Sequence, residues 1–159
     1  MKIRKINLAD LDVITNLYID FLNYQLRFGK FVYKHKPKIN KKELKQTLKK
    51  RIIYSKDKLF LVAEEKNGLV GFVQAEIISN KKGKTNKKVV EIVDIYSKFK
   101  RKGIGKKLLL EIEKWANSKK TDFILWEFIS GNKSAEDFCI KNKFKYFKIK
   151  MLKKLKNEN

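Results

Sequence analysis

The stretch KRKGIG, residues 100–105, places two glycines among basic side chains, directly before a segment with helical apolar spacing. Glycine lets a backbone turn approach a ligand closely, because it has no Cβ to collide with phosphate oxygens. A helix that begins here would add free amide groups and the positive end of its dipole. Residues of these types in this order predict a cradle for an anion, most naturally a phosphate.

Two common phosphate-binding motifs do not fit this stretch. A Walker loop ends in Gly-Lys-Ser/Thr, whereas Gly105 is followed by Lys106 and Lys107. A dinucleotide fingerprint requires a third glycine at the position that Leu108 occupies. The glycine pair alone is equally compatible with a tight turn that binds nothing, so the surrounding elements have to decide.

Hydrophobic periodicity predicts the elements that position this turn. Alternating or continuous apolar runs predict strands at 2–6, 58–65, 69–79, 89–96, 122–128 and 143–152. Apolar residues at helical spacing predict helices within 7–28, 40–54, 104–118 and 132–142. The Asn-Gly pair at 67–68 predicts a hairpin, and the helix at 104–118 between two strands predicts a parallel crossover.

These elements predict an α/β fold of the α+β type, in which helices flank a mixed, mostly antiparallel central sheet. No linker interrupts the pattern, so we expect one domain over 1–152 and a frayed basic tail at 153–159. No apolar run reaches the roughly 20 residues of a membrane helix, and the N-terminus lacks the apolar core of a signal peptide. We therefore expect a cytoplasmic protein that does not bind a membrane.

Several motifs in order along the chain resemble the GNAT-type N-acetyltransferases. The matching stretches are EIVDIYSKFKRKGIGKKLLLEIEKW at 91–115 and GNKSAEDFCIKNKFKY at 131–146. The order of the other elements agrees over nearly the whole chain. The resemblance implies a GNAT-like acyl-CoA N-acyltransferase fold. It also implies an enzyme that moves an acetyl group from acetyl-CoA to a primary amine by direct attack on the thioester.

The resemblance also implies where acetyl-CoA binds. The pyrophosphate is expected on backbone amides of the glycine turn, the pantetheine arm along the strand before it, and an asparagine beside the coenzyme. The residues so assigned are Ile95, Lys100, Arg101, Lys102, Gly103, Ile104, Gly105, Lys106 and Asn132. Lys100 stands where the family usually has Arg or Gln, which is a mild departure because backbone amides provide most of the contacts.

The acceptor amine must lose a proton before it attacks a thioester, and a carboxylate or an ordered water can take that proton. Glu91 is the candidate general base, either directly or through water. Glu91 and Asp94 point to opposite faces of a regular strand, but a bulge, which the family often has here, would re-aim one of them. An ion pair between Glu91 and a surface lysine is at least as compatible with the sequence, and Glu76 and Glu127 are alternative bases.

A second departure concerns the general acid. Family members often have a tyrosine in the helix after the asparagine, placed to protonate the departing thiolate, whereas this chain has Cys139. A thiol can donate a proton in principle, so Cys139 is the candidate acid. The favoured alternative is a small buried hydrophobic residue, which is the common role of a free cysteine. Tyr96 and Tyr146 are other hydroxyls to consider.

The formal net charge of +23 would attract phosphates and nucleic acid. Only four of the 40 basic residues are arginine, however, and the lysines are spread along the whole chain. Nucleic-acid surfaces usually use arginine for bidentate contacts, so a general lysine bias is the better explanation. The alternative function is a basic nucleic-acid or ribosome-associated protein on the same fold, which binds CoA with little or no turnover.

The expected partners are acetyl-CoA and an amine acceptor, without a metal, since the one cysteine and one histidine cannot form a metal site. The acceptor stays open between a small amine, a protein N-terminus and a lysine, and a homodimer is compatible with the sequence. The positive charge disfavours polycations such as aminoglycosides and polyamines, unless Asp20, Glu43 or Glu76 offsets it locally. The segment 29–36 is expected to border the acceptor groove.

Overall fold

The computed structural model describes residues 1–28, 38–53, 56–79 and 88–153. The chain forms two compact units, Met1–Glu127 and Phe128–Asn159. The first unit contains the sheet, three helices and the glycine turn, whereas the second contains one helix. In the described ranges, no helix is long and apolar enough to cross a membrane.

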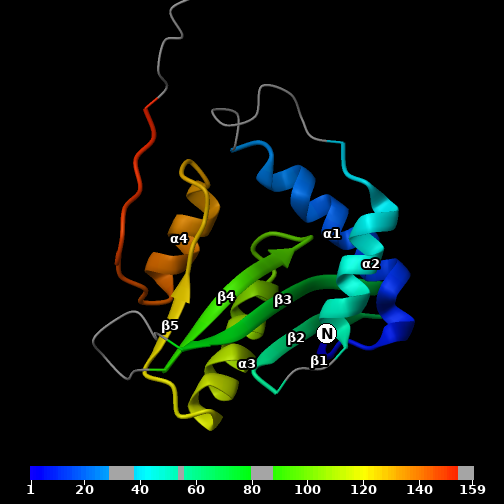
Figure 1. Cartoon of the computed structure of the whole chain (residues 1–159), viewed down its shortest axis with the longest axis horizontal. Coiled ribbons are helices and arrows are strands. Elements are labelled where there is room, and N and C mark those ends of the chain that lie inside the picture. The colour runs from blue at the N-terminus through cyan, green and yellow to red at the C-terminus, as the bar shows by residue number, and fades with distance from the viewer. Residues whose placement is uncertain (29–37, 54–55, 80–87, 154–159) are drawn as a thin grey trace, which may run out of the picture. The chain divides into compact units, whose positions relative to one another are not determined.

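A sheet of five strands in the described residues forms the centre of the first unit (Figure 1), in the spatial order β1-β2-β3-β4-β5. Neighbouring strands are antiparallel except β4 and β5, which run parallel. The expected mixed, mostly antiparallel sheet is thereby confirmed. The strands are β1 (Lys2–Lys5), β2 (Lys58–Glu65), β3 (Gly68–Ser79), β4 (Lys88–Ser97) and β5 (Phe123–Trp126).

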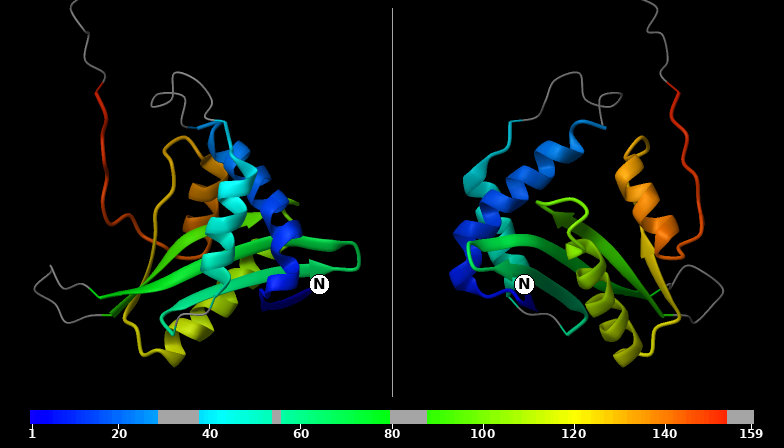
Figure 2. Two further views of the ribbon diagram at one scale, coloured as in Figure 1. Left: turned by 45° about the vertical axis from the view of Figure 1, so that its right-hand side comes forward. Right: turned by 180° about the vertical axis from the view of Figure 1, so that it is seen from behind.

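Helices cover both faces of this sheet (Figure 2). On one face lie α1 (Leu11–Gln25) and α2 (Lys41–Ile52), and on the other lies α3 (Ile104–Ser118). A short 3-10 turn, η1 (Leu8–Asp10), precedes α1 and begins with a capping box formed by Asn7. Asn40 caps α2, because its side chain accepts hydrogen bonds from the first amides of that helix.

Aromatic packing holds α1 against the sheet. Phe72 of β3 is fully buried, and the Tyr18 ring stacks on it at 5.0 Å between centroids. Phe21 and Phe60 meet the same ring edge-on, at 5.6 and 6.1 Å. Such pairs stabilise a fold beyond their burial of apolar area. The stack fixes the position of Tyr18, whose hydroxyl belongs to the site described below.

On the opposite face, Gly71 of β3 lets α3 approach the sheet closely. A Cβ at this position would lie 2.8 Å from the carbonyl oxygen of Tyr96 and 2.9 Å from the Ile104 side chain. Ile104 is the first residue of α3. Gly71 therefore determines how closely the N-terminal turn of that helix lies to β3 and β4. No local sequence pattern points to this contact, because Gly71 and Ile104 are far apart in the chain.

The second unit contains α4 (Lys133–Lys141), which Asn132 caps by accepting a hydrogen bond from the Ala135 amide at 3.2 Å. The strand predicted over 143–152 is wrong, since these described residues form no strand. Their apolar side chains are exposed, among them Phe147 and Met151. Alternating residues form a strand only where a neighbouring strand accepts the backbone hydrogen bonds, and the alternation alone does not supply that neighbour.

We expect Gly71→Ala to lower the free energy of unfolding by about 1–3 kcal/mol, because the added methyl group overpacks the contact between β3, β4 and α3. Urea unfolding measures this loss. In the double variant Gly71→Ala/Ile104→Ala, part of the clash is relieved, so the combined loss should be smaller than the sum of the single losses. Additive losses would show that Ile104 and residue 71 do not interact.

Candidate active site

A β-bulge in β4 determines which side chains reach the site. Gln74 of β3 pairs with Asp94 and Ala75 pairs with Ile92, so Val93 is the extra residue. Glu91 pairs with Glu76, which lies two residues from Gln74 and therefore on the same face of β3. Glu91 and Asp94 consequently share one face of the sheet. The expected bulge is confirmed, and it re-aims a carboxylate as anticipated.

The bulge also marks the point where β4 and β5 separate. The parallel pairing runs from Val89 to Ile92 on β4, and β4 continues to Ser97. Among the described residues, no strand pairs with 93–97 on the side that β5 covers before the bulge. Such an edge presents backbone N–H and C=O groups that an extended ligand can bond. Ile95 lies on this edge, at the position expected for the pantetheine arm.

The glycine turn follows directly. Gly103 is the N-cap of α3 with φ of +74°, and no described side chain caps the helix. The first intrahelical bond runs from the Lys107 amide to the Gly103 carbonyl at 3.0 Å, so the preceding amides of the first turn have no helical partner. A Cβ built on Gly103 meets nothing within 4 Å, so the space over the turn is open. This geometry suits an anion and confirms the predicted strand-turn-helix context.

The basic side chains around the turn are less organised than its backbone. Lys100, Arg101, Lys102 and Lys106 are exposed. The Lys100 ammonium donates to the Tyr24 hydroxyl at 3.2 Å and lies 4.8 Å from that ring's centroid, so it contacts α1. The Ile104 side chain is buried, which leaves only its amide for a ligand. The backbone is therefore the better-defined part of the cradle.

A polar cluster lies on the α1 and α2 side of the bulge. The Tyr18 hydroxyl donates to the Asp94 carboxylate. Arg51 of α2 donates through Nη1 to the Tyr18 oxygen at 2.9 Å and to Gln74 Oε1 at 3.0 Å, and it lies 3.6 Å from Asp94. Burial is the main cause that raises the pKa of both Asp94 and Tyr18. The four side chains come from α1, α2, β3 and β4.

The sequence analysis considered Asp94 but missed Tyr18, Arg51 and Gln74 as members of the cluster. Tyr18 belongs to the apolar face of α1, as its stack on Phe72 shows, so helical spacing alone gives it no polar role. Its hydroxyl reaches Asp94 because the bulge turns that carboxylate towards α1. A polar residue in an otherwise apolar strand, such as Gln74 in LVGFVQAEIIS, is the signal that could have pointed to this cluster.

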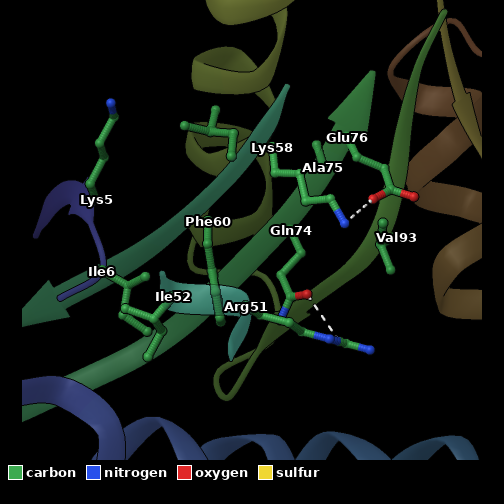
Figure 3. Close-up of a pocket in the computed structure, with 11 residues that line it drawn as sticks. Lys5, Ile6, Arg51, Ile52, Lys58, Phe60, Gln74, Ala75, Glu76 and Val93 are labelled. Carbon is green, nitrogen blue, oxygen red and sulfur yellow. Dashed lines mark hydrogen bonds and ion pairs between the residues drawn. The ribbon is translucent and has the colours of Figure 1, made fainter. Parts of the chain in front are cut away.

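A pocket of about 310 Å³ adjoins the cluster (Figure 3). Its charged and polar lining consists of Lys5, Arg51, Lys58, Gln74 and Glu76, and Val93 of the bulge contributes to its wall. Figure 3 shows Lys58 directed to Glu76, with 3.0 Å between the ammonium and the carboxylate. The pocket thus meets the sheet at the residue where β4 departs from β5.

The carboxylates proposed from the sequence differ in their burial and in their position relative to the pocket. Glu91 is half-buried on the pocket side of the sheet, next to Glu76 in the ladder. Glu76 lines the pocket, whereas Asp20, Glu43 and Glu127 are exposed and do not. Among the three carboxylates considered as local offsets to the positive charge, the structure therefore places only Glu76 in this pocket. Of the expected groove segment 29–36, no residue lies in the described ranges.

Two predicted site residues belong to the second unit. Asn132 is buried and caps α4. Cys139 is buried in the same helix, and burial raises the pKa of its thiol to about 11. A proton donor works best when its pKa lies near the working pH, so this environment favours packing over acid catalysis. The Tyr146 hydroxyl donates to Glu136 in the same unit.

The raised pKa of Asp94 predicts a pH effect on stability. The folded protein holds this proton more tightly than the unfolded chain, so the stabilisation is complete below the ordinary aspartate value of 3.8 and is lost as the pH rises through the folded pKa. Relative to Asp94→Asn, which cannot ionise, the native protein should therefore lose stability between about pH 4 and neutrality. Urea unfolding of both proteins across this range measures the difference.

Asp12→Asn is a matched control with the opposite sign. Lys45 lowers the pKa of Asp12, so the native protein should gain stability relative to this variant as the pH rises from acid values. A difference between native and Asp94→Asn proteins that grows with pH in the same direction as this control would contradict the assignment for Asp94.

The chain is similar to known proteins in its sequence pattern and in its fold. The model of the Acetyltransferase (GNAT) family matches residues 21–144. No curated protein is significantly similar in sequence.

In the described residues, no group of three or more metal-ligating side chains could hold a metal ion.

Solved structures share the fold at low sequence identity. A mutant of the BH1408 protein from Bacillus halodurans has 16% identity and a TM-score of 0.81, with 98% of this chain and 99% of that chain covered. The aminoglycoside acetyltransferase meta-AAC0020 from an uncultured soil sample, in complex with sisomicin, has 20% identity and a TM-score of 0.62 over 98% and 96%.

AAC(6')-Iy, in complex with the bisubstrate analogue CoA-S-monomethyl-acetylneamine, has 15% identity and a TM-score of 0.70 over 98% of this chain and 97% of that chain. These likenesses agree with the mixed sheet and with the helix that follows its fourth strand. Because the family model also spans most of the sequence, the chain belongs to the GNAT acetyltransferase family.

Proposed function

We propose that this protein transfers an acetyl group from acetyl-CoA to a primary amine. The observation that carries the proposal is the uncapped N-terminus of α3 at Gly103, directly after a strand whose edge is open beyond Ile92. The turn offers backbone donors to a pyrophosphate, and the edge offers donors and acceptors to a pantetheine arm. Members of the GNAT family use acetyl-CoA, and the bound analogue of AAC(6')-Iy contains a CoA moiety.

The coenzyme contacts follow from this geometry. Amides from Lys100 to Lys106 would bond the pyrophosphate, and the exposed side chains of Lys100, Arg101 and Lys102 would add charge. Binding through Lys100 requires its ammonium to leave the Tyr24 hydroxyl. The backbone at Ile95, on the open edge of β4, would bond the pantetheine arm.

Acetyl-CoA supplies an activated thioester, so no covalent enzyme intermediate is needed. The amine nitrogen forms a bond to the acetyl carbon, and the bond from that carbon to sulfur breaks. The sulfur leaves as a thiolate and takes a proton, while the amine gives one up. An N–H group of the β4 backbone near Ile95 would donate to the thioester oxygen.

Glu91 is the proposed general base, acting through water. It lies on the pocket side of the sheet, where it pairs with Glu76 of β3. Among the described side chains it forms no ion pair, unlike Glu76, which Lys58 contacts, and Asp94, which Tyr18 and Arg51 contact. The alternative pairing of Glu91 with a lysine is therefore not seen in the described part of the chain.

The glycine turn gives the main test of the proposed function. Acetyl-CoA at about 100 times its dissociation constant stabilises a protein by about 2.7 kcal/mol, so it should raise the Tm of the native protein. Gly103→Val should remove this shift, because a side chain fills the space over the turn and strains a backbone with φ of +74°. Thermal unfolding with and without acetyl-CoA measures both.

Gly68→Val is the matched control. Gly68 lies in the hairpin between β2 and β3 with φ of +112°, so this variant should lose stability for the same backbone reason but keep the shift with acetyl-CoA. Absence of a shift in the native protein at saturating acetyl-CoA would overturn the proposed function. RNA binding with a steep salt dependence that survives Gly103→Val would support the nucleic-acid alternative.

The role of Cys139 has its own test. Because burial raises the pKa of this thiol to about 11, we expect Cys139→Ala to leave kcat unchanged, measured by CoA thiol release. A large loss in Cys139→Ala, together with faster turnover in Cys139→Tyr, would instead assign the general acid to this position.

A further inference from the structure

The pocket of about 310 Å³ lies where an acceptor has to approach the proposed thioester. Val93 lines it, and Val93 is the bulge residue at which the edge of β4 becomes open. An amine at this end would reach the thioester, while the rest of the acceptor fills the pocket. The volume is at the lower end of the roughly 300–1,000 Å³ typical of ligand pockets, so it suits a small acceptor.

The charge in this pocket is mainly positive. Its lining includes three cations, Lys5, Arg51 and Lys58, and one carboxylate, Glu76, which Lys58 contacts at 3.0 Å. Asp94, which is not part of the lining, lies 3.6 Å from Arg51. Arg51 uses only Nη1 in its bonds to Tyr18 and Gln74. To the described residues, its Nη2 and Nε make no hydrogen bond, and 41% of its side chain is exposed. A guanidinium with free donors on one edge binds a carboxylate in a bidentate manner.

Gln74 supplies a second donor in the same place. Only 6% of this residue is exposed, and its Oε1 accepts from Arg51, which fixes the orientation of the amide. Its Nε2 is buried and has no partner among the residues that the structure describes. A buried amide N–H without an acceptor is unfavourable, so this group requires an oxygen atom. Arg51 thus presents donors to a molecule in the pocket. Gln74, which also lines the pocket, orients Arg51 and holds a buried donor that has no acceptor among the described residues.

We propose that this pocket selects an acceptor that carries a carboxylate beside its amine, as an amino acid does, with Arg51 and Gln74 binding the carboxylate. The proposal rests on the proposed acetyl transfer and names its substrate class. An acceptor of this class differs from the sisomicin found in complex with meta-AAC0020. The pocket cations disfavour a polycation, and they favour the neutral form of the attacking amine.

The experiment compares L-phenylalanine with phenethylamine, which differs from it by the carboxylate alone, and includes sisomicin as a polycation. The apolar wall formed by Ile6, Ile52 and Phe60 suits the side chain of these probes. With acetyl-CoA and thiol release as the readout, kcat/KM for L-phenylalanine should exceed that for phenethylamine by about tenfold or more. Equal or better use of phenethylamine or sisomicin by the native protein would overturn the proposal.

Two variants test whether Arg51 is responsible for the preference for the carboxylated acceptor. Arg51→Met should lower kcat/KM for L-phenylalanine by about tenfold and change the value for phenethylamine much less. Lys45→Met removes a positive charge from the same helix outside the pocket, and it should leave the preference unchanged. A preference that survives Arg51→Met would overturn the role of Arg51. Each variant should retain its Tm shift with acetyl-CoA, which shows that it is folded.

A binding measurement covers the case in which neither amine is turned over. The corresponding products, N-acetyl-L-phenylalanine and N-acetylphenethylamine, are added to the native protein in thermal unfolding. The carboxylated product should raise Tm more, and equal or absent shifts would overturn the proposal. Failure of the proposed function is recognised separately, because it would abolish the shift with acetyl-CoA itself.

Discussion

One extra residue in β4 determines the arrangement on which the candidate site depends. Val93 has no partner on β3. Side chains on the two sides of Val93 therefore point to faces of the sheet that differ from those of a regular alternation. Glu91 and Asp94 then share the face that α1 and α2 cover. The parallel pairing of β4 with β5 ends at Ile92, the residue before Val93. A strand without the bulge would send one of these carboxylates to the α3 side.

The two faces of the sheet carry different groups of the candidate site. On the α3 side, Gly71 allows the first turn of α3 to lie against β3 and β4, so the uncapped amides follow closely on the open strand edge. On the other side, the stack of Tyr18 on Phe72 brings a hydroxyl to Asp94, and Arg51 connects both to Gln74. Backbone groups on one side and side chains on the other are suited to a coenzyme and an acceptor, respectively.

The net charge of +23 does not by itself indicate which groups of the candidate site would bind a ligand. Around the glycine turn, exposed lysines surround a backbone whose own amides are the better-defined part of the proposed anion site. In the pocket, the relevant groups are the Arg51 guanidinium, which three neighbours hold, and the Gln74 amide N–H, which has no acceptor in the part of the chain that the structure describes. Burial and geometry, more than the number of lysines, give these groups their proposed roles, since exposed charges are screened by solvent and salt.

Local pattern was sufficient for most of the scaffold. Periodicity predicted all five strands of the sheet and helices in the regions of α1 to α4, and the glycine turn was found between a strand and a helix. These features depend on residues close together in the chain, so the sequence by itself determines them. The expected strand at 143–152 failed because alternation does not provide a neighbouring strand.

Contacts between distant segments were decided only by the tertiary structure. The close approach at Gly71 joins three elements, whereas the cluster of Tyr18, Arg51, Gln74 and Asp94 and the pocket beside it each join four or more. Even the expected bulge left open which carboxylate it would re-aim, because that depends on the register with β3. The sequence determined the elements and the glycine turn, whereas packing determined which side chains meet, since register and burial are properties of the whole fold.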